Sequence, residues 1–84
     1  MDNKGTKVKL WDKVMLKGGP GNSRVDICRV VPPAGADPEI GRTSAESPMG
    51  SAILGRSAGE LVEFETMGIP KSVRILRIIP DAND

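Results

Sequence analysis

The sequence predicts an α+β fold in which a small antiparallel β-sheet packs on one short helix at about residues 48–54. Two observations lead to this fold class. Ten glycines and seven prolines among 84 residues leave little room for a long helix and favour short strands joined by tight turns. Several segments also alternate apolar and polar residues with a period of two, as half-buried strands do. The length fits a single domain, residues 1–84, with a core at about residues 7–79.

A first hairpin is predicted near the N-terminus. Lys7–Lys17 alternates like a strand, and Asp12 interrupts the alternation and indicates a bend or bulge. The apolar positions are Val8, Leu10, Val14 and Leu16. Gly18–Ser23 is a run of turn-forming residues, and Arg24–Val31 is rich in β-branched residues before two prolines end it. An irregular loop is expected over Pro32–Gly41.

A short helix is predicted after an extended stretch at Arg42–Ala45. Ser47 suits the N-cap, since its hydroxyl can accept from free backbone N–H groups, and Pro48 suits the first helical position. One face of the helix is apolar, through Met49, Ala52 and Ile53. Gly55 can close the helix in a left-handed conformation. About two helical turns are not stable alone, so this helix must lie on the sheet.

A second hairpin is predicted from Glu60–Thr66 and Lys71–Ile79, with Met67–Pro70 as a four-residue loop. This register places apolar residues opposite one another on one face and acids opposite bases on the other. The expected pairs are Val62 with Ile75, Phe64 with Val73, Glu63 with Arg74, and Glu60 with Arg77. These charges are therefore assigned a structural use and not a catalytic one.

The composition excludes several kinds of chemistry. Without histidine there is no His-based triad and no imidazole metal site, and a single cysteine builds neither a disulfide framework nor a Cys-rich metal cluster. Cys28 is expected to be a small core residue in a reducing, cytoplasmic compartment. Asp37 and Glu39 lie on a loop and are not expected to act as an acid/base pair. We therefore expect no catalytic residue, metal or cofactor.

Charge is unevenly distributed along the chain. Residues 1–24 hold six bases and two acids, whereas residues 25–66 hold three bases and seven acids. Four of the bases in the first segment form what is here called the lysine strip: Lys7, Lys9, Lys13 and Lys17. It is interpreted as a solvated strand whose edge is protected by lysines, with contact to nucleic-acid phosphates as the alternative. Trp11 is expected to anchor the first hairpin, with an exposed binding residue as the alternative.

Residues from Ala36 to Ile79 resemble the C-terminal domain of the Gre transcript-cleavage factors, and the resemblance extends loosely over residues 7–79. The matching motifs are Ala36-Asp37, Gly41-Arg42, Glu46-Ser47-Pro48, Ile53-Leu54-Gly55-Arg56, Gly59-Glu60, Val62 to Thr66 and Ile75 to Ile78. The resemblance implies an FKBP-like fold and a bacterial RNA polymerase partner, gripped at the coiled coil on the rim of its secondary channel. The contact residues carried over by position are Glu46, Ser47, Pro48 and Met49.

Gre factors place a long coiled coil ahead of this domain, and its acidic tip supports RNA cleavage. The sequence starts at about its first strand without heptads, so we expect a stand-alone domain that modulates elongation without stimulating cleavage. The alternatives are a structural interaction domain with weak self-association, a nucleic-acid-binding domain, and a peptidyl-prolyl isomerase. The isomerase is disfavoured because such pockets use several aromatic residues, and only Trp11 and Phe64 are available.

Overall fold

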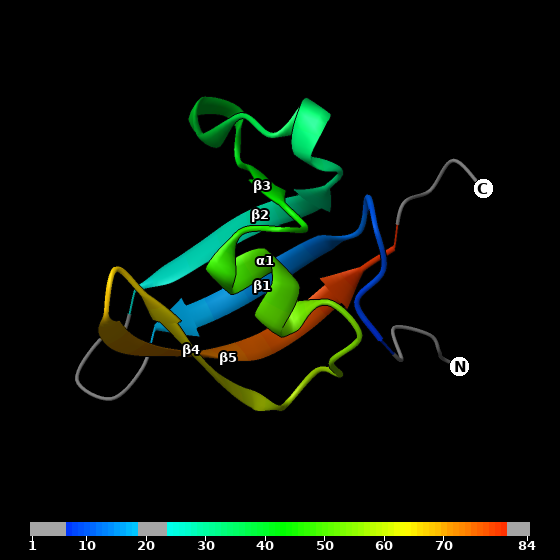
Figure 1. Cartoon of the computed structure of the whole chain (residues 1–84). Coiled ribbons are helices and arrows are strands. Elements are labelled where there is room, and N and C mark those ends of the chain that lie inside the picture. Colours follow the sequence, from blue (N-terminus) through cyan, green and yellow to red (C-terminus); the bar gives the residue numbers. More distant parts are fainter. Residues whose placement is uncertain (1–6, 19–23, 81–84) are drawn as a thin grey trace.

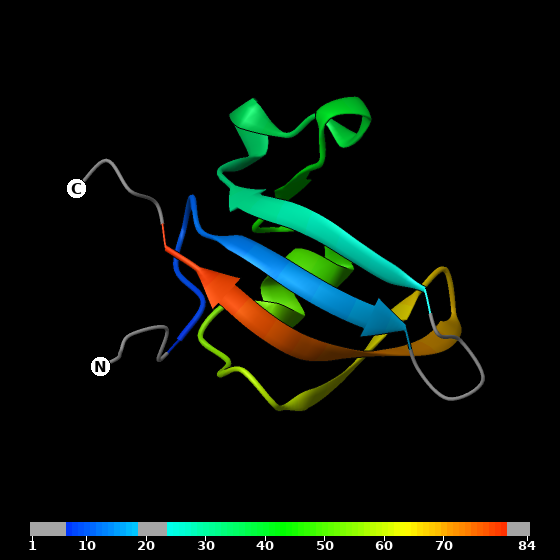
Figure 2. The same ribbon diagram turned by 180° about the vertical axis from the view of Figure 1, so that it is seen from behind.

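The computed structural model describes residues 7–18 and 24–80. Within them, the strands are β1 (Lys13–Gly18), β2 (Val25–Val31), β3 (Arg42–Ser44), β4 (Leu61–Thr66) and β5 (Ile69–Ile79). They form one curled sheet in the order β3-β2-β1-β5-β4 (Figure 1). The helix α1 (Pro48–Ile53) lies across one face of this sheet, and the opposite face of the three central strands carries no helix (Figure 2).

The predicted antiparallel pairing of β1 and β2 is confirmed, with Lys13 opposite Arg29. The strand begins at Lys13 and not at Lys7, because the chain turns at Leu10 and Trp11, where Trp11 has a positive φ of 76°. The predicted bend at Asp12 is confirmed: its carboxylate is buried and accepts from the backbone N–H of Lys9 at 2.9 Å. The glycine-rich turn between the two strands falls mostly outside the described residues.

The sheet is mixed, which corrects the prediction of a purely antiparallel one. β3 is the predicted extended stretch, but it runs parallel to β2, with Val30 beside Thr43. The expected loop at Pro32–Gly41 contains two single-turn 3₁₀ helices, η1 (Pro33–Gly35) and η2 (Pro38–Ile40). This crossover brings the chain back from the end of β2 to the level of Arg29, where β3 begins to pair. A parallel strand requires such a connection. A strand of three residues is too short to show its direction in the sequence.

The predicted register of the second hairpin is wrong by two residues. Met67-Gly68 is a two-residue loop, Val62 lies opposite Val73, and Phe64 lies opposite Lys71. The wrong pairs are Val62 with Ile75, Phe64 with Val73, Glu63 with Arg74, and Glu60 with Arg77. An even shift keeps each side chain on its expected face, so the apolar face survives while the expected acid–base pairs are lost.

Pro70 explains why a four-residue loop looked plausible, because proline is rare inside paired strands. Pro70 lies in β5 opposite Glu65, one pair beyond the Thr66–Ile69 pair that closes the hairpin. Antiparallel pairs alternate between hydrogen-bonded and non-hydrogen-bonded, so the second pair needs no N–H from Pro70. Within residues 7–18 and 24–80, β1 pairs with β5 from Val73 onward, so no described strand pairs with Pro70 on its other side.

The core lies between α1 and the inner face of the sheet. Ile53 of α1 is fully buried, and Met49 and Ala52 pack partly against the same cluster, so the predicted apolar face of the helix is confirmed. The sheet contributes Val14, Leu16, Cys28, Val30, Val62, Ile75 and Ile78. Burying one such aliphatic side chain contributes about 1.5–3 kcal/mol, so this contact holds a helix too short to persist alone.

Candidate partner-binding site

The segment between β3 and α1, residues 46–49, is here called the Ser-Pro tip. β3 ends at Ser44, whose carbonyl oxygen accepts from both the backbone N–H and the hydroxyl of Ser47, at 3.1 and 2.8 Å. The Ser44 hydroxyl oxygen accepts from the backbone N–H of Glu46 at 3.0 Å. These three hydrogen bonds fix the direction in which the tip leaves the sheet.

Ser47 is the predicted helix N-cap, and the structure confirms it. Its hydroxyl oxygen accepts from the backbone N–H of Gly50 at 3.0 Å, and Pro48 takes the first helical position. The same hydroxyl donates to Ser44, so its hydrogen-bonding capacity is mostly used inside the domain. Ser47 is half-buried and shapes the tip more than it offers a group to a partner.

Gly50 permits the close approach of α1 to the end of β3. It is buried, and a Cβ at this position would overlap the carbonyl oxygen of Ser44 and lie 2.9 Å from its carbonyl carbon. The same Cβ would be 3.0 Å from the hydroxyl oxygen of Ser47. Gly50 was not singled out from the sequence, since its role depends on a strand that precedes it by six residues.

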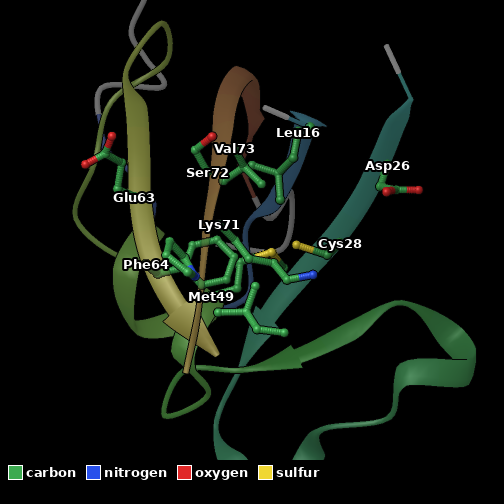
Figure 3. Close-up of a pocket in the computed structure, with 12 residues that line it drawn as sticks. Leu16, Asp26, Cys28, Met49, Glu63, Phe64, Lys71, Ser72 and Val73 are labelled. Carbon is green, nitrogen blue, oxygen red and sulfur yellow. The ribbon is translucent and has the colours of Figure 1, made fainter. Parts of the chain in front are cut away.

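The four predicted contact residues are adjacent but not equivalent. Glu46 and Pro48 are exposed, whereas Ser47 and Met49 are half-buried. Met49 packs against the core and lines a concavity, and Figure 3 shows it with Phe64 on one side and Cys28 on the other. The tip therefore presents Glu46 and Pro48 outward, supported by Ser47 and Met49.

The concavity beside the tip has a volume of about 740 Å³ and is open to solvent. Its lining residues are Leu16, Gly18, Asp26, Cys28, Met49, Glu63, Phe64, Ile69, Pro70, Lys71, Ser72 and Val73. The sequence did not reveal it, because α1 and four strands each contribute to it and the true hairpin register is needed to place Lys71 next to Phe64. The one signal for the concavity in the sequence was an apolar residue, Ile69, next to the turn of the last hairpin. The structure shows that its side chain is exposed.

Trp11 does not line this concavity, so Phe64 is the single aromatic residue among those lining it. The backbone N–H of Trp11 donates to Val30 of β2, and its carbonyl oxygen accepts from the Arg29 guanidinium at 2.6 Å. Its ring lies beside Gly35 of η1 and remains 39% exposed. The backbone of Trp11 therefore joins the first hairpin, while its ring is exposed, as the alternative of an exposed binding residue requires.

Cys28 lies at the floor of the concavity. It is a buried free thiol, which confirms it as a core residue. Burial raises the pKa of the Cys28 thiol above its ordinary value, and a hydrogen bond with Thr43 opposes this rise. Asp37 and Glu39 form a local cap, in which the Asp37 carboxylate accepts from the Glu39 N–H at 3.1 Å.

Residues 7–18 and 24–80 contain no group of three or more His, Cys, Asp or Glu side chains placed to hold a metal ion. None of the helices in the same residues is long and apolar enough to cross a membrane.

The sequence model described as "Transcription elongation factor, GreA/GreB, C-term" matches residues 4–80. The chain is 36% identical over 72 residues to transcription elongation factor GreA of Chloroherpeton thalassium, covering 86% of this chain and 43% of that protein. It is 34% identical over 58 residues to GreA of Streptococcus pneumoniae, covering 69% of this chain and 36% of that protein.

The fold is similar to the crystal structure of GreA factor homolog 1 (Gfh1) of Thermus thermophilus, with a TM-score of 0.76 at 27% identity. That match covers 95% of this chain and 53% of the Gfh1 chain. The chain spans about half of Gfh1 and less than half of the two GreA relatives. Because the family model matches residues 4–80, the chain belongs to the family of GreA/GreB transcription elongation factor C-terminal domains.

Proposed function

We propose that this chain acts as a single domain that docks on bacterial RNA polymerase through the Ser-Pro tip and modulates transcription elongation. The contact surface is the coiled coil at the rim of the polymerase secondary channel, and the compartment is the cytoplasm. The observation that carries this proposal is the tip itself, held by internal hydrogen bonds and presenting Glu46 and Pro48 to solvent.

The geometry suits recognition by a preformed surface. A partner that binds the tip orders little new backbone, since the turn and the helix cap already exist in the free domain, and this limits the entropy lost on binding. Glu46 offers a carboxylate to a basic group, and Pro48 offers apolar area without rotamer freedom to lose. Ser47 and Met49 serve as positioning residues, the first through its two hydrogen bonds and the second through packing.

We further propose that the domain performs no reaction and does not itself stimulate RNA cleavage. Several carboxylates already have structural partners: Asp12 holds the Lys9 N–H, Asp37 caps η2, and Glu60 accepts from the Ser57 N–H at 2.7 Å. The FKBP-like description belongs to the shape alone, because a shared fold does not carry an activity. No feature of the concavity favours the isomerase over the docking domain.

The docking proposal is tested by binding to purified core RNA polymerase. The Glu46→Lys/Pro48→Ala variant changes two exposed residues of the tip, and we expect it to weaken binding at least tenfold. The Pro38→Ala/Glu39→Lys variant is a matched control, since it makes the same changes at exposed residues of η2. Equal binding of the two variants would refute the assignment of the tip.

The same proteins are then added to stalled elongation complexes. We expect the wild-type chain to change the elongation rate and to leave the RNA as long as with polymerase alone. It should also reduce cleavage stimulated by a full-length GreA, and the tip variant should not. RNA shortening by the wild-type chain alone would disprove the non-catalytic part of the proposal, while leaving the docking part to the binding assay.

A further inference from the structure

The sheet face opposite α1 concentrates positive charge. Its outward positions on β1, β2 and the paired part of β5 alternate with the buried core residues and lie on the face that Figure 2 shows uncovered. Five of them are cations, here called the basic face: Lys13, Lys17, Arg29, Arg74 and Arg77. The other outward residues of these three strands are Met15, Val25, Ile27, Val31, Leu76 and Ile79, none of which is acidic, and the outward carboxylates Glu63 and Glu65 lie on the edge strand β4.

The register places like charges directly opposite each other. Lys17 pairs with Arg74 across β1 and β5, and Lys13 pairs with Arg29 across β1 and β2. Arg77 lies between these rows, opposite Met15. Like charges in facing positions destabilise a sheet, so the arrangement weakens the fold unless an anion neutralises it.

The carboxylates of the described residues do not neutralise the basic face. In the described residues the ion pairs join Arg24 to Asp26 and Arg56 to Glu60, and none involves the basic face. Arg29 and Arg74 each donate to a backbone carbonyl, of Trp11 at 2.6 Å and of Gly59 at 2.9 Å. These bonds orient two guanidinium groups without removing their charge.

The dimensions and chemistry of the face suit a polyanion with evenly spaced charges. Lys13 and Lys17 mark the two cation rows and are four residue steps apart on β1, so the rows lie about 14 Å apart, and three strands span about 10 Å. Duplex DNA carries a phosphate every 3.4 Å or so along each strand, so several phosphates fit over this area. None of the outward residues of β1, β2 and the paired part of β5 is aromatic, and Trp11 lies only at the end of the face beside Gly35, which favours contact with the backbone.

We propose that the basic face binds the sugar–phosphate backbone of nucleic acid, without sequence preference. It lies on the opposite side of the sheet from α1, so one domain can hold nucleic acid and a protein partner at the Ser-Pro tip together (Figures 1 and 2). The sequence pattern indicated a lysine strip, but only Lys13 and Lys17 of that strip lie on this face. Arginines of β2 and β5 complete it.

The test measures fluorescence anisotropy of a labelled random DNA duplex and a labelled oligo(U) RNA, titrated with the full chain over a range of salt concentrations. The Lys13→Gln/Lys17→Gln/Arg77→Gln variant removes three charges from the face. The Arg24→Gln/Arg56→Gln/Lys71→Gln variant removes three exposed charges elsewhere and leaves the same net charge. We expect the first to bind at least tenfold more weakly than the second.

The salt dependence gives a second measurement. Each phosphate contact contributes about 0.9 to the slope of log affinity against log salt for a duplex, so the slope should fall by about 2.7 in the first variant and stay constant in the second. Three results overturn the proposal: no binding by the wild-type chain at low salt, equal losses in both variants, or equally strong competition by polyglutamate. Polymerase binding is measured separately, so loss of one function is distinguished from loss of the other.

Discussion

The Ser-Pro tip and the β4–β5 turn both reverse the chain within a few residues, but they are held in different ways. At the tip, the hydroxyl groups of Ser44 and Ser47 make hydrogen bonds with backbone groups. The buried Gly50 lets α1 contact the end of β3. At the β4–β5 turn, Met67 and Gly68 both have positive φ, of 54° and 77°, and Met67 is 96% exposed. The first turn is fixed by its own residues, whereas the second is imposed by the strands that it joins.

This difference bears on function. A contact surface must keep its shape when it meets a partner, and the tip has internal hydrogen bonds that do so. The β4–β5 turn carries a methionine where glycine or asparagine is favoured, so its residues do not specify its geometry. Substitutions at the tip should therefore lower stability, and a suitable substitution at the β4–β5 turn should raise it.

The largest effect is expected from Gly50→Ala. The added methyl group would overlap the carbonyl oxygen of Ser44, and backbone atoms cannot rotate away as a side chain does. Overpacking of this kind costs about 3 kcal/mol, which outweighs the roughly 1 kcal/mol that alanine gains in helix propensity. In an 84-residue domain the melting temperature should fall by about 10 °C or more.

Ser51→Ala is the matched control, since Ser51 is the next residue of α1 and is exposed. It loses one long hydrogen bond from its hydroxyl to the Pro48 carbonyl oxygen, of 3.3 Å, and gains helix propensity. We expect a change within about 0.5 kcal/mol. A Gly50→Ala protein as stable as Ser51→Ala would show that α1 does not press on β3 as described.

A smaller loss is expected from Ser47→Ala. The substitution removes the acceptor of the Gly50 N–H and the donor to the Ser44 carbonyl oxygen, and losing an N-cap costs about 1 kcal/mol. Urea denaturation measures the change. Ser47→Thr keeps a hydroxyl and should recover most of the stability. If Thr and Ala are equally destabilising, steric fit at the tip matters more than its hydrogen bonds.

The sequence predicted features that depend on residues close together in the chain. The N-cap at Ser47, proline at the first helical position and the apolar face of α1 follow from local rules, as does the pairing of β1 with β2. The parallel direction of β3 was missed because it depends on the crossover from β2. The role of Gly50 was missed because it depends on how closely α1 packs against the end of β3.

The candidate surfaces divide in the same way. The four tip residues are consecutive and were found through a motif, whereas it was the helical spacing that placed Met49 toward the core. The concavity and the basic face gather side chains from several strands. The basic face depends on β1 lying beside β5, and nothing in either strand alone indicates this neighbour. Lys13 and Arg77 are more than sixty positions apart in the sequence, whereas the sheet places them on adjacent strands.

A stabilising effect, smaller than the losses at Gly50 and Ser47, is expected from Met67→Asn. A two-residue hairpin loop with positive φ at both positions is typical of a type I′ turn, in which Asn-Gly is strongly preferred. Because Met67 is almost fully exposed, its replacement loses no packing, and we expect a gain of about 0.5–1 kcal/mol in urea denaturation. Met67→Val should be destabilising, since a β-branched residue fits a positive φ poorly. Equal stability of the Asn and Val variants would contradict the two-residue loop and would favour the four-residue loop that the charge pattern suggested.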